Sequence, residues 1–161
     1  MGSVNEIRST ARTLHGPIRS PSWIFNDDRN GFSYHGSAKD TGWPIKDGLN
    51  ITYAEKPRGV VVSPVTFWKA ADLPALELDA AFTFASTNKA LNVIVEVFPC
   101  SGKRISYSLT VQPDGTRKTY ALQLNSSAEY TGAMKQINLY LPKTDGAARL
   151  YKIAGASPKK Q

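Results

Sequence analysis

The sequence has few of the residues on which many catalytic and metal sites depend. Its 161 residues include one cysteine and two histidines, which are Cys100, His15 and His35. A single cysteine excludes a disulfide framework within the chain. Neither histidine stands beside a second type of metal ligand at a familiar spacing. G-x-S-x-G, P-loop and dinucleotide motifs are missing. We interpret Cys100, which follows Pro99 at an expected strand end, as a half-buried and unreactive thiol.

The sequence also lacks the run of about 18 apolar residues that a transmembrane helix needs, so we predict no membrane span. It shows no secretory signal. Met1-Gly2-Ser3 is typical of an engineered start from which a native signal has been cut, so this absence does not decide the native compartment. The net charge is +7, but Lys and Arg are scattered in ones and twos, with Lys159-Lys160 as the one compact cluster. Because nucleic-acid binders concentrate their charge on one element, we predict no nucleic-acid partner and interpret the charge as solvated surface. An anionic ligand is the alternative.

Short segments with period-two alternation follow one another from Trp23 onward, separated by Gly, Pro, Asn and Asp. The clearest are 76–84, 91–97 and 103–111; the others are 23–25, 32–35, 49–53, 60–64, 120–124, 137–141 and 150–154. No segment keeps a helical apolar period for long, although 126–134 has room for one turn. About ten short strands with turn signals every 8–12 residues predict an all-β fold, a jelly-roll sandwich of two antiparallel sheets. We place this single domain at 14–155, between a polar lead-in (1–13) and a polar tail (156–161).

Paired carboxylates for glycoside hydrolysis cannot be assembled from the sequence, because most Asp residues fall in turns. Glu96 differs, since it lies mid-strand on a polar face in line with Asn92. We interpret it as a solvated residue or half of a cross-strand ion pair, with a ligand contact as the alternative. A catalytic partner for Glu96 is not identifiable. We therefore predict a protein that is not an enzyme, and a small hydrolase or lyase is the minority hypothesis.

The pattern from Trp23 to Ala154 resembles the galactose-binding-like β-sandwich domains, which include non-catalytic carbohydrate-binding modules. The shared features are the early aromatic pair Trp23 and Phe25, an acidic turn ending in Gly31, Asp47-Gly48-Leu49 opening a strand, the segment 60–64, the Asp72–Pro74 loop and the Ser101-Gly102-Lys103 turn. The resemblance implies a module that binds a polysaccharide or glycan, neutral or acidic. It further implies a secreted or cell-surface protein that carries other domains. No cofactor is certain, but such modules often hold a structural calcium, for which Asp27 and Asp28 lie in a suitable turn.

Sugar-binding modules of this kind hold the apolar face of a pyranose against an exposed aromatic ring, while amides and charges bind its hydroxyls. Trp23 is expected in the core. Trp43, in a turn-like loop, is either a plug or an exposed platform. One of Phe67 and Trp68 should face inward and the other outward. Tyr140 should face outward.

Two binding surfaces are therefore open. One is a loop edge with Trp43, Trp68, His35, Asp40 and Arg58, and the other is a sheet face with Asn92, Glu96, Gln123, Asn138 and Tyr140. The predicted ligand-binding residues are Trp43, Trp68, Asn92, Glu96, Gln123, Asn138 and Tyr140. The alternation favours the sheet face, and an ordinary solvated face is the bland alternative. The alternative function is a protein-interaction or accessory sandwich domain.

Overall fold

A computed structural model describes residues 21–85 and 87–156 of the chain. The predicted lead-in (1–13), His15 and all of the predicted tail except Ala156 lie outside these residues. Within the described residues no helix is long and apolar enough to cross a membrane.

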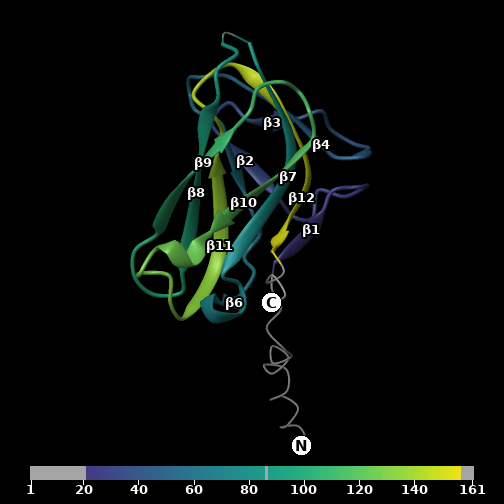
Figure 1. The fold of residues 1–161 in the computed structure, drawn as a ribbon. Helices are drawn as coiled ribbons and strands as arrows, with labels where there is room; N and C mark the ends of the chain where they lie inside the picture. The colour runs from purple at the N-terminus through teal and green to yellow at the C-terminus, as the bar shows by residue number, and fades with distance from the viewer. Residues whose placement is uncertain (1–20, 86, 157–161) are drawn as a thin grey trace, which may run out of the picture.

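The described chain forms two antiparallel sheets, each of six strands, that pack face to face (Figure 1). Sheet A has the order β10-β7-β12-β4-β3, and β1 pairs with β12 beside this path. Its strands are β1 (Ser22–Ile24), β3 (Lys39–Asp40), β4 (Leu49–Tyr53), β7 (Ala75–Phe84), β10 (Lys118–Gln123) and β12 (Gly146–Gly155). Sheet B has the order β2-β5-β11-β8-β9, and β6 pairs with β11. Its strands are β2 (Ser33–His35), β5 (Val60–Val62), β6 (Trp68–Lys69), β8 (Leu91–Pro99), β9 (Ile105–Val111) and β11 (Ala133–Tyr140).

The connections make the sandwich a jelly roll. From β4 to β12 the chain passes back and forth between the sheets, and only β5–β6 and β8–β9 follow each other within one sheet. Sheet A therefore contains the order β4-β12-β7-β10, and sheet B contains β5-β11-β8-β9. Both the all-β fold class and the two-sheet jelly-roll architecture are confirmed.

Sequence patterning located the longer strands well and missed the shortest. The expected strand 49–53 coincides with β4, and 76–84 and 91–97 differ from β7 and β8 by one or two residues at an end. Strands β3 and β6 have two residues each and so are too short to show alternation. The described residues form single helical turns at the 3₁₀ elements η1 (Ala70–Asp72) and η2 (Leu124–Ser126), the second overlapping the expected segment 126–134 only at Ser126.

Alternate residues of both sheets point inward and fill the core between them. On β9 the inward residues Ile105, Tyr107, Leu109 and Val111 are all buried, and their neighbours Ser106, Ser108 and Thr110 are exposed. At one end Trp23 and Phe25 each form a T-shaped contact with Phe32, with ring centroids 5.0 and 5.1 Å from that of Phe32. Trp23 is thus a core residue, as predicted.

Trp68 is also a core residue, with 1% of its surface exposed. Its Nε1 donates a hydrogen bond to the Tyr130 hydroxyl at 3.0 Å, and that hydroxyl donates to the Leu73 carbonyl at 2.7 Å. Burial raises the pKa of Tyr130 to about 12, so the hydroxyl keeps its proton for this bond. Trp68 therefore cannot stack on a ligand, and its predicted binding role is wrong. Phe67 is the outward member of the pair and is 55% exposed.

Candidate functional site: the outward face of sheet B

Four of the seven predicted binding residues lie together on the outward face of sheet B, which we call the polar face. Asn92 and Glu96 come from β8, and Asn138 and Tyr140 from the neighbouring strand β11. Their inward neighbours, such as Val95 and Leu139, are buried in the core. The same face carries side chains from β2, from the residue before β9 and from the loop before β5, which are His35, Arg104 and Arg58.

The centre of the polar face holds two acceptor oxygens without partners. Glu96 and Asn138 are directly opposite in the β8–β11 register. Glu96 is only 6% exposed, and Arg104 Nε lies 3.1 Å from Glu96 Oε2. The Glu96 Oε1 and Asn138 Oδ1 atoms are both buried, and neither has a partner at full hydrogen-bond geometry among the described residues, although the Tyr140 hydroxyl lies near enough to Glu96 to interact with it. A buried acceptor left unpaired costs about 1–3 kcal/mol, so these two oxygens are poised to accept from a ligand.

Tyr140 supplies an aromatic ring beside these oxygens. It lies two residues from Asn138 on the same face of β11 and is partly buried. The guanidinium carbon of Arg58 is 5.9 Å from the ring centroid, and Arg58 Nε donates to the Leu141 carbonyl at 2.6 Å. Burial, and then the charge of Glu96 and an interaction of the Tyr140 hydroxyl with the Glu96 side chain, raise the pKa of Tyr140, so the hydroxyl keeps its proton at neutral pH.

Asn92 lies toward one end of the polar face and is already engaged. Its Oδ1 accepts a hydrogen bond from Thr110 Oγ1 at 2.9 Å, and its backbone oxygen accepts one from Arg58 at 3.4 Å. The Glu96–Arg104 contact is the cross-strand ion pair that the sequence offered as one interpretation of Glu96. Arg104 was missed, although it continues the outward phase of Ser106 and Ser108 on β9.

Other predicted residues lie elsewhere. Gln123 is on β10, the edge strand of sheet A, so it is exposed on the opposite side of the sandwich. The proposed loop-edge surface does not form, because Trp68 is buried while His35 and Arg58 belong to the polar face. Cys100 is exposed, not half-buried.

Trp43 is displayed on the loop between β3 and β4, on the sheet A side, with 78% of its surface exposed. Asp40 holds this loop. Its Oδ1 accepts from the Gly42 backbone N–H at 2.7 Å, and its Oδ2 accepts from Arg29 at 2.6 Å and from the Tyr34 hydroxyl at 2.8 Å. The loop is also anchored by Ile45, which is buried. Trp43 is therefore an exposed ring on a tethered loop and not a plug.

Asp27 and Asp28, the residues suggested for calcium, lie in an exposed turn. Asp28 Oδ1 accepts a hydrogen bond from the Asn30 backbone N–H, and both Asp27 and Asp28 are exposed. The described residues contain no group of three or more His, Cys, Asp or Glu side chains placed to hold a metal ion.

No protein-family model and no curated protein matches this sequence. Solved structures do match its fold. The chain superposes on the family 11 carbohydrate-binding module of the cellulosomal cellulase Lic26A-Cel5E of Clostridium thermocellum with a TM-score of 0.52 and 14% identity, covering 89% of this chain and 99% of that one. The N-terminal cellulose-binding domain of Cellulomonas fimi β-1,4-glucanase C gives a TM-score of 0.53 and 15% identity, covering 91% and 99%.

The sandwich has the fold of these carbohydrate-binding modules. It also matches part of the agarase AgWH50C, with a TM-score of 0.56 and 14% identity over 88% of this chain and 25% of the agarase. The match thus spans nearly the whole of two modules that were solved on their own but only about a quarter of the agarase. At such identities the comparisons establish the fold alone, and the function must be argued from the side chains.

Proposed function

We propose that the chain is a non-catalytic carbohydrate-binding module that holds a neutral polysaccharide on the polar face of sheet B. The observation that carries the proposal is the pair of unpaired buried acceptors, Glu96 Oε1 and Asn138 Oδ1, next to the half-buried ring of Tyr140. Sugar hydroxyls donate to such acceptors, and the C–H face of a pyranose stacks on a tyrosine ring. The fold shared with two carbohydrate-binding modules supports this assignment.

The acceptors also indicate the class of sugar. Glu96 presents a carboxylate oxygen to the ligand, and a second carboxylate placed there would be repelled. The nearest guanidinium, that of Arg104, already faces the other oxygen of Glu96. A neutral saccharide, which offers only hydroxyl donors and acceptors, suits this centre better than an acidic one.

Binding without turnover is the expected behaviour of this face. Hydrolysis of a glycosidic bond in most families uses two carboxyl groups about 5–10 Å apart. The strands of sheet B, all of whose residues are described, carry Glu96 as their one acid. We infer that the protein works as an accessory domain of a larger secreted or cell-surface protein, in keeping with the agarase of which a matching sandwich is one part.

Affinity electrophoresis in gels of neutral β-glucan, xylan and agarose tests the proposal. We expect retardation of the native chain in at least one gel, and its loss in Tyr140→Ala and Asn138→Leu. Loss of one stacked ring corresponds to about 1–2 kcal/mol, or about five- to thirtyfold in affinity. Trp43→Ala is the matched control, because it removes a larger exposed ring from the sheet A side and should keep the retardation.

Circular dichroism must show that each variant is folded. Retardation that survives both Tyr140→Ala and Asn138→Leu would refute the placement of the site on the polar face. Glu96→Gln separates binding from catalysis. Release of sugar by the native chain that Glu96→Gln abolishes would make the protein a hydrolase or lyase.

A further inference from the structure

The outward face of sheet A lies on the opposite side of the sandwich from the polar face. It carries a hollow that is separate from the polar face. Its volume is about 430 Å³, within the range of about 300–1,000 Å³ that is typical of small-molecule sites. Small side chains from the central strands β7 and β12, those of Ala81 and Ala147, lie at its base. Hydroxyl and amide groups surround them, from Thr41, Asn50, Thr52 and Thr83.

The register explains this shape. Ala147 lies between Thr83 and Thr52 across the sheet, and Arg149 lies between Ala81 and Asn50. Two alanines in the middle of an outward face leave space that larger residues would fill. The hollow is therefore lined by hydrogen-bonding groups over an apolar base, with one guanidinium at its side.

Arg149 is a cation held in place without an acidic partner. Its Nη2 donates to the Lys46 carbonyl at 3.2 Å, but it forms no ion pair with any described residue. Its Nε is buried and also lacks a partner. A Cβ on Gly48 would lie 3.0 Å from Arg149 Cγ and Nε, so the absence of a side chain at Gly48 lets the arginine pack against the loop.

The lining of the hollow also includes Tyr151, which lies at a β-bulge in β12. The pairing of β12 with β7 shifts between Leu150 and Lys152, which leaves Tyr151 as the extra residue. The guanidinium carbon of Arg117 lies 3.9 Å from the centroid of the Tyr151 ring, and that of Arg149 lies 5.5 Å from it. Arg117 is neutralised by two hydrogen bonds to Asp79, of 2.9 and 2.8 Å, whereas Arg149 keeps its charge uncompensated. A pre-positioned guanidinium with free donors is well suited to a planar or tetrahedral oxyanion.

We propose that this hollow is a second saccharide site, which takes a sugar residue carrying a carboxylate or sulfate group. Arg149 binds the anionic group, the surrounding Thr and Asn side chains bind hydroxyls, and the loop that displays Trp43 borders the hollow at Thr41. The proposal is independent of the polar face, since the two sites lie on opposite sheets and share no residue. A site for an anionic sugar is also in keeping with the net charge of +7.

Calorimetric titration of the full chain tests it, with a tetramer of galacturonic acid and its carboxyl-reduced neutral form as one pair of ligands. A sulfated galactan oligosaccharide and its desulfated form make the second pair. We expect the anionic member of at least one pair to bind about tenfold or more tightly, in line with one charge-assisted contact. Preference for only one pair identifies the group as carboxylate or sulfate.

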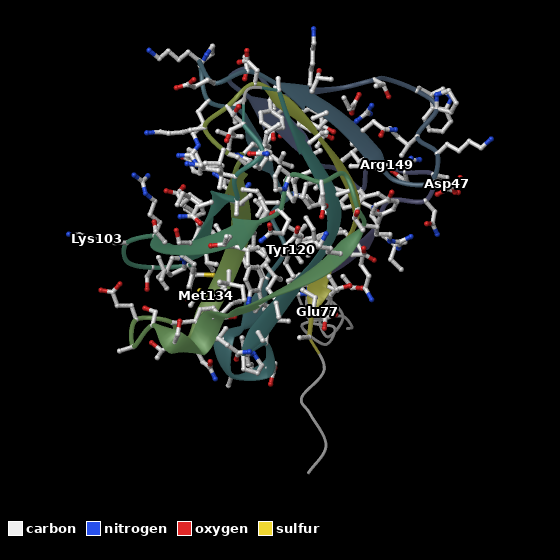
Figure 2. All side chains as sticks on the ribbon, turned by 45° about the horizontal axis from the view of Figure 1, so that its top comes forward. Asp47, Glu77, Lys103, Tyr120, Met134 and Arg149 are labelled. Atoms are coloured by element: carbon white, nitrogen blue, oxygen red, sulfur yellow. The ribbon has the colours of Figure 1, made fainter. Side chains whose placement is uncertain are left out.

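The variants Arg149→Gln and Ala147→Leu should abolish this preference, the first by removing the charge and the second by filling the hollow. Lys103→Gln is the control for net charge, because Figure 2 shows Lys103 on the side of the molecule away from Arg149 and Asp47. Tyr140→Ala should leave the preference intact, which separates this site from the polar face. Equal binding of both members of each pair would overturn the proposal. So would a preference that survives Ala147→Leu, or one that Lys103→Gln and Arg149→Gln weaken equally.

Discussion

Replacing Asp40 by Asn should destabilise the fold at neutral pH. The Asp40 side chain is 8% exposed. Its carboxylate accepts hydrogen bonds from Arg29 Nε and Nη2, the Tyr34 hydroxyl and the Gly42 backbone N–H. Asparagine keeps one acceptor but turns an N–H₂ group toward Arg29. Charged hydrogen bonds contribute about 1.5–3 kcal/mol each, and Arg29 is 36% exposed, which weakens its share. We expect the free energy of unfolding to fall by about 2–3 kcal/mol.

The pH dependence follows from the same contacts. The Arg29 hydrogen bonds, helped by Tyr34 and Gly42 and opposed by burial, hold the pKa of Asp40 below its ordinary value. A depressed carboxyl pKa stabilises the folded state above the unfolded pKa of about 3.9, and this stabilisation is lost as pH falls through the folded pKa. The difference between native and Asp40→Asn chains should therefore be full at pH 7 and shrink below about pH 4.

Urea denaturation followed by tryptophan fluorescence, from pH 7 to pH 3, measures both effects. Asp79→Asn is the control, because its partner Arg117 is 57% exposed and such a surface pair, screened by solvent, contributes little to stability. Equal losses in the two variants, or a loss in Asp40→Asn that does not change with pH, would refute the reasoning.

Three further changes probe the core, the sheet A hollow and the exposed thiol. Trp68→Phe removes the hydrogen-bond donor to Tyr130 and leaves a cavity, so the free energy of unfolding should fall by about 2–4 kcal/mol. A fall of less than about 1 kcal/mol would contradict the buried hydrogen bond. Gly48→Ala should lower the free energy of unfolding by about 1–3 kcal/mol, because φ of Gly48 is +116° and the new Cβ meets Arg149. The same change should weaken anionic saccharide binding. Unchanged binding would contradict the packing of Arg149 against Gly48. Cys100 should react with one equivalent of a thiol reagent in the folded chain, and protection until unfolding would show that it is buried.

Alternation along the chain determined the fold class and the outward orientation of four residues of the polar face. Residues two apart on a strand share a face, so Asn92 and Glu96 on one strand, and Asn138 and Tyr140 on another, could be assigned outward before any pairing was known. The packing of two sheets against each other was likewise predictable, because half-polar strands of this length must bury one face against a second sheet.

Pairing between strands was decided only by the tertiary structure. Gln123 has the same outward phase as Asn138, yet it lies on sheet A, since alternation says nothing about which sheet a strand joins. Trp68 and Phe67 could not be told apart, because β6 has only two residues and its direction depends on β11. The hollow with Arg149 depends on a bulge at Tyr151 that breaks the period-two pattern. Local sequence sets which side chains share a face, while contacts between residues distant in the chain set which faces meet.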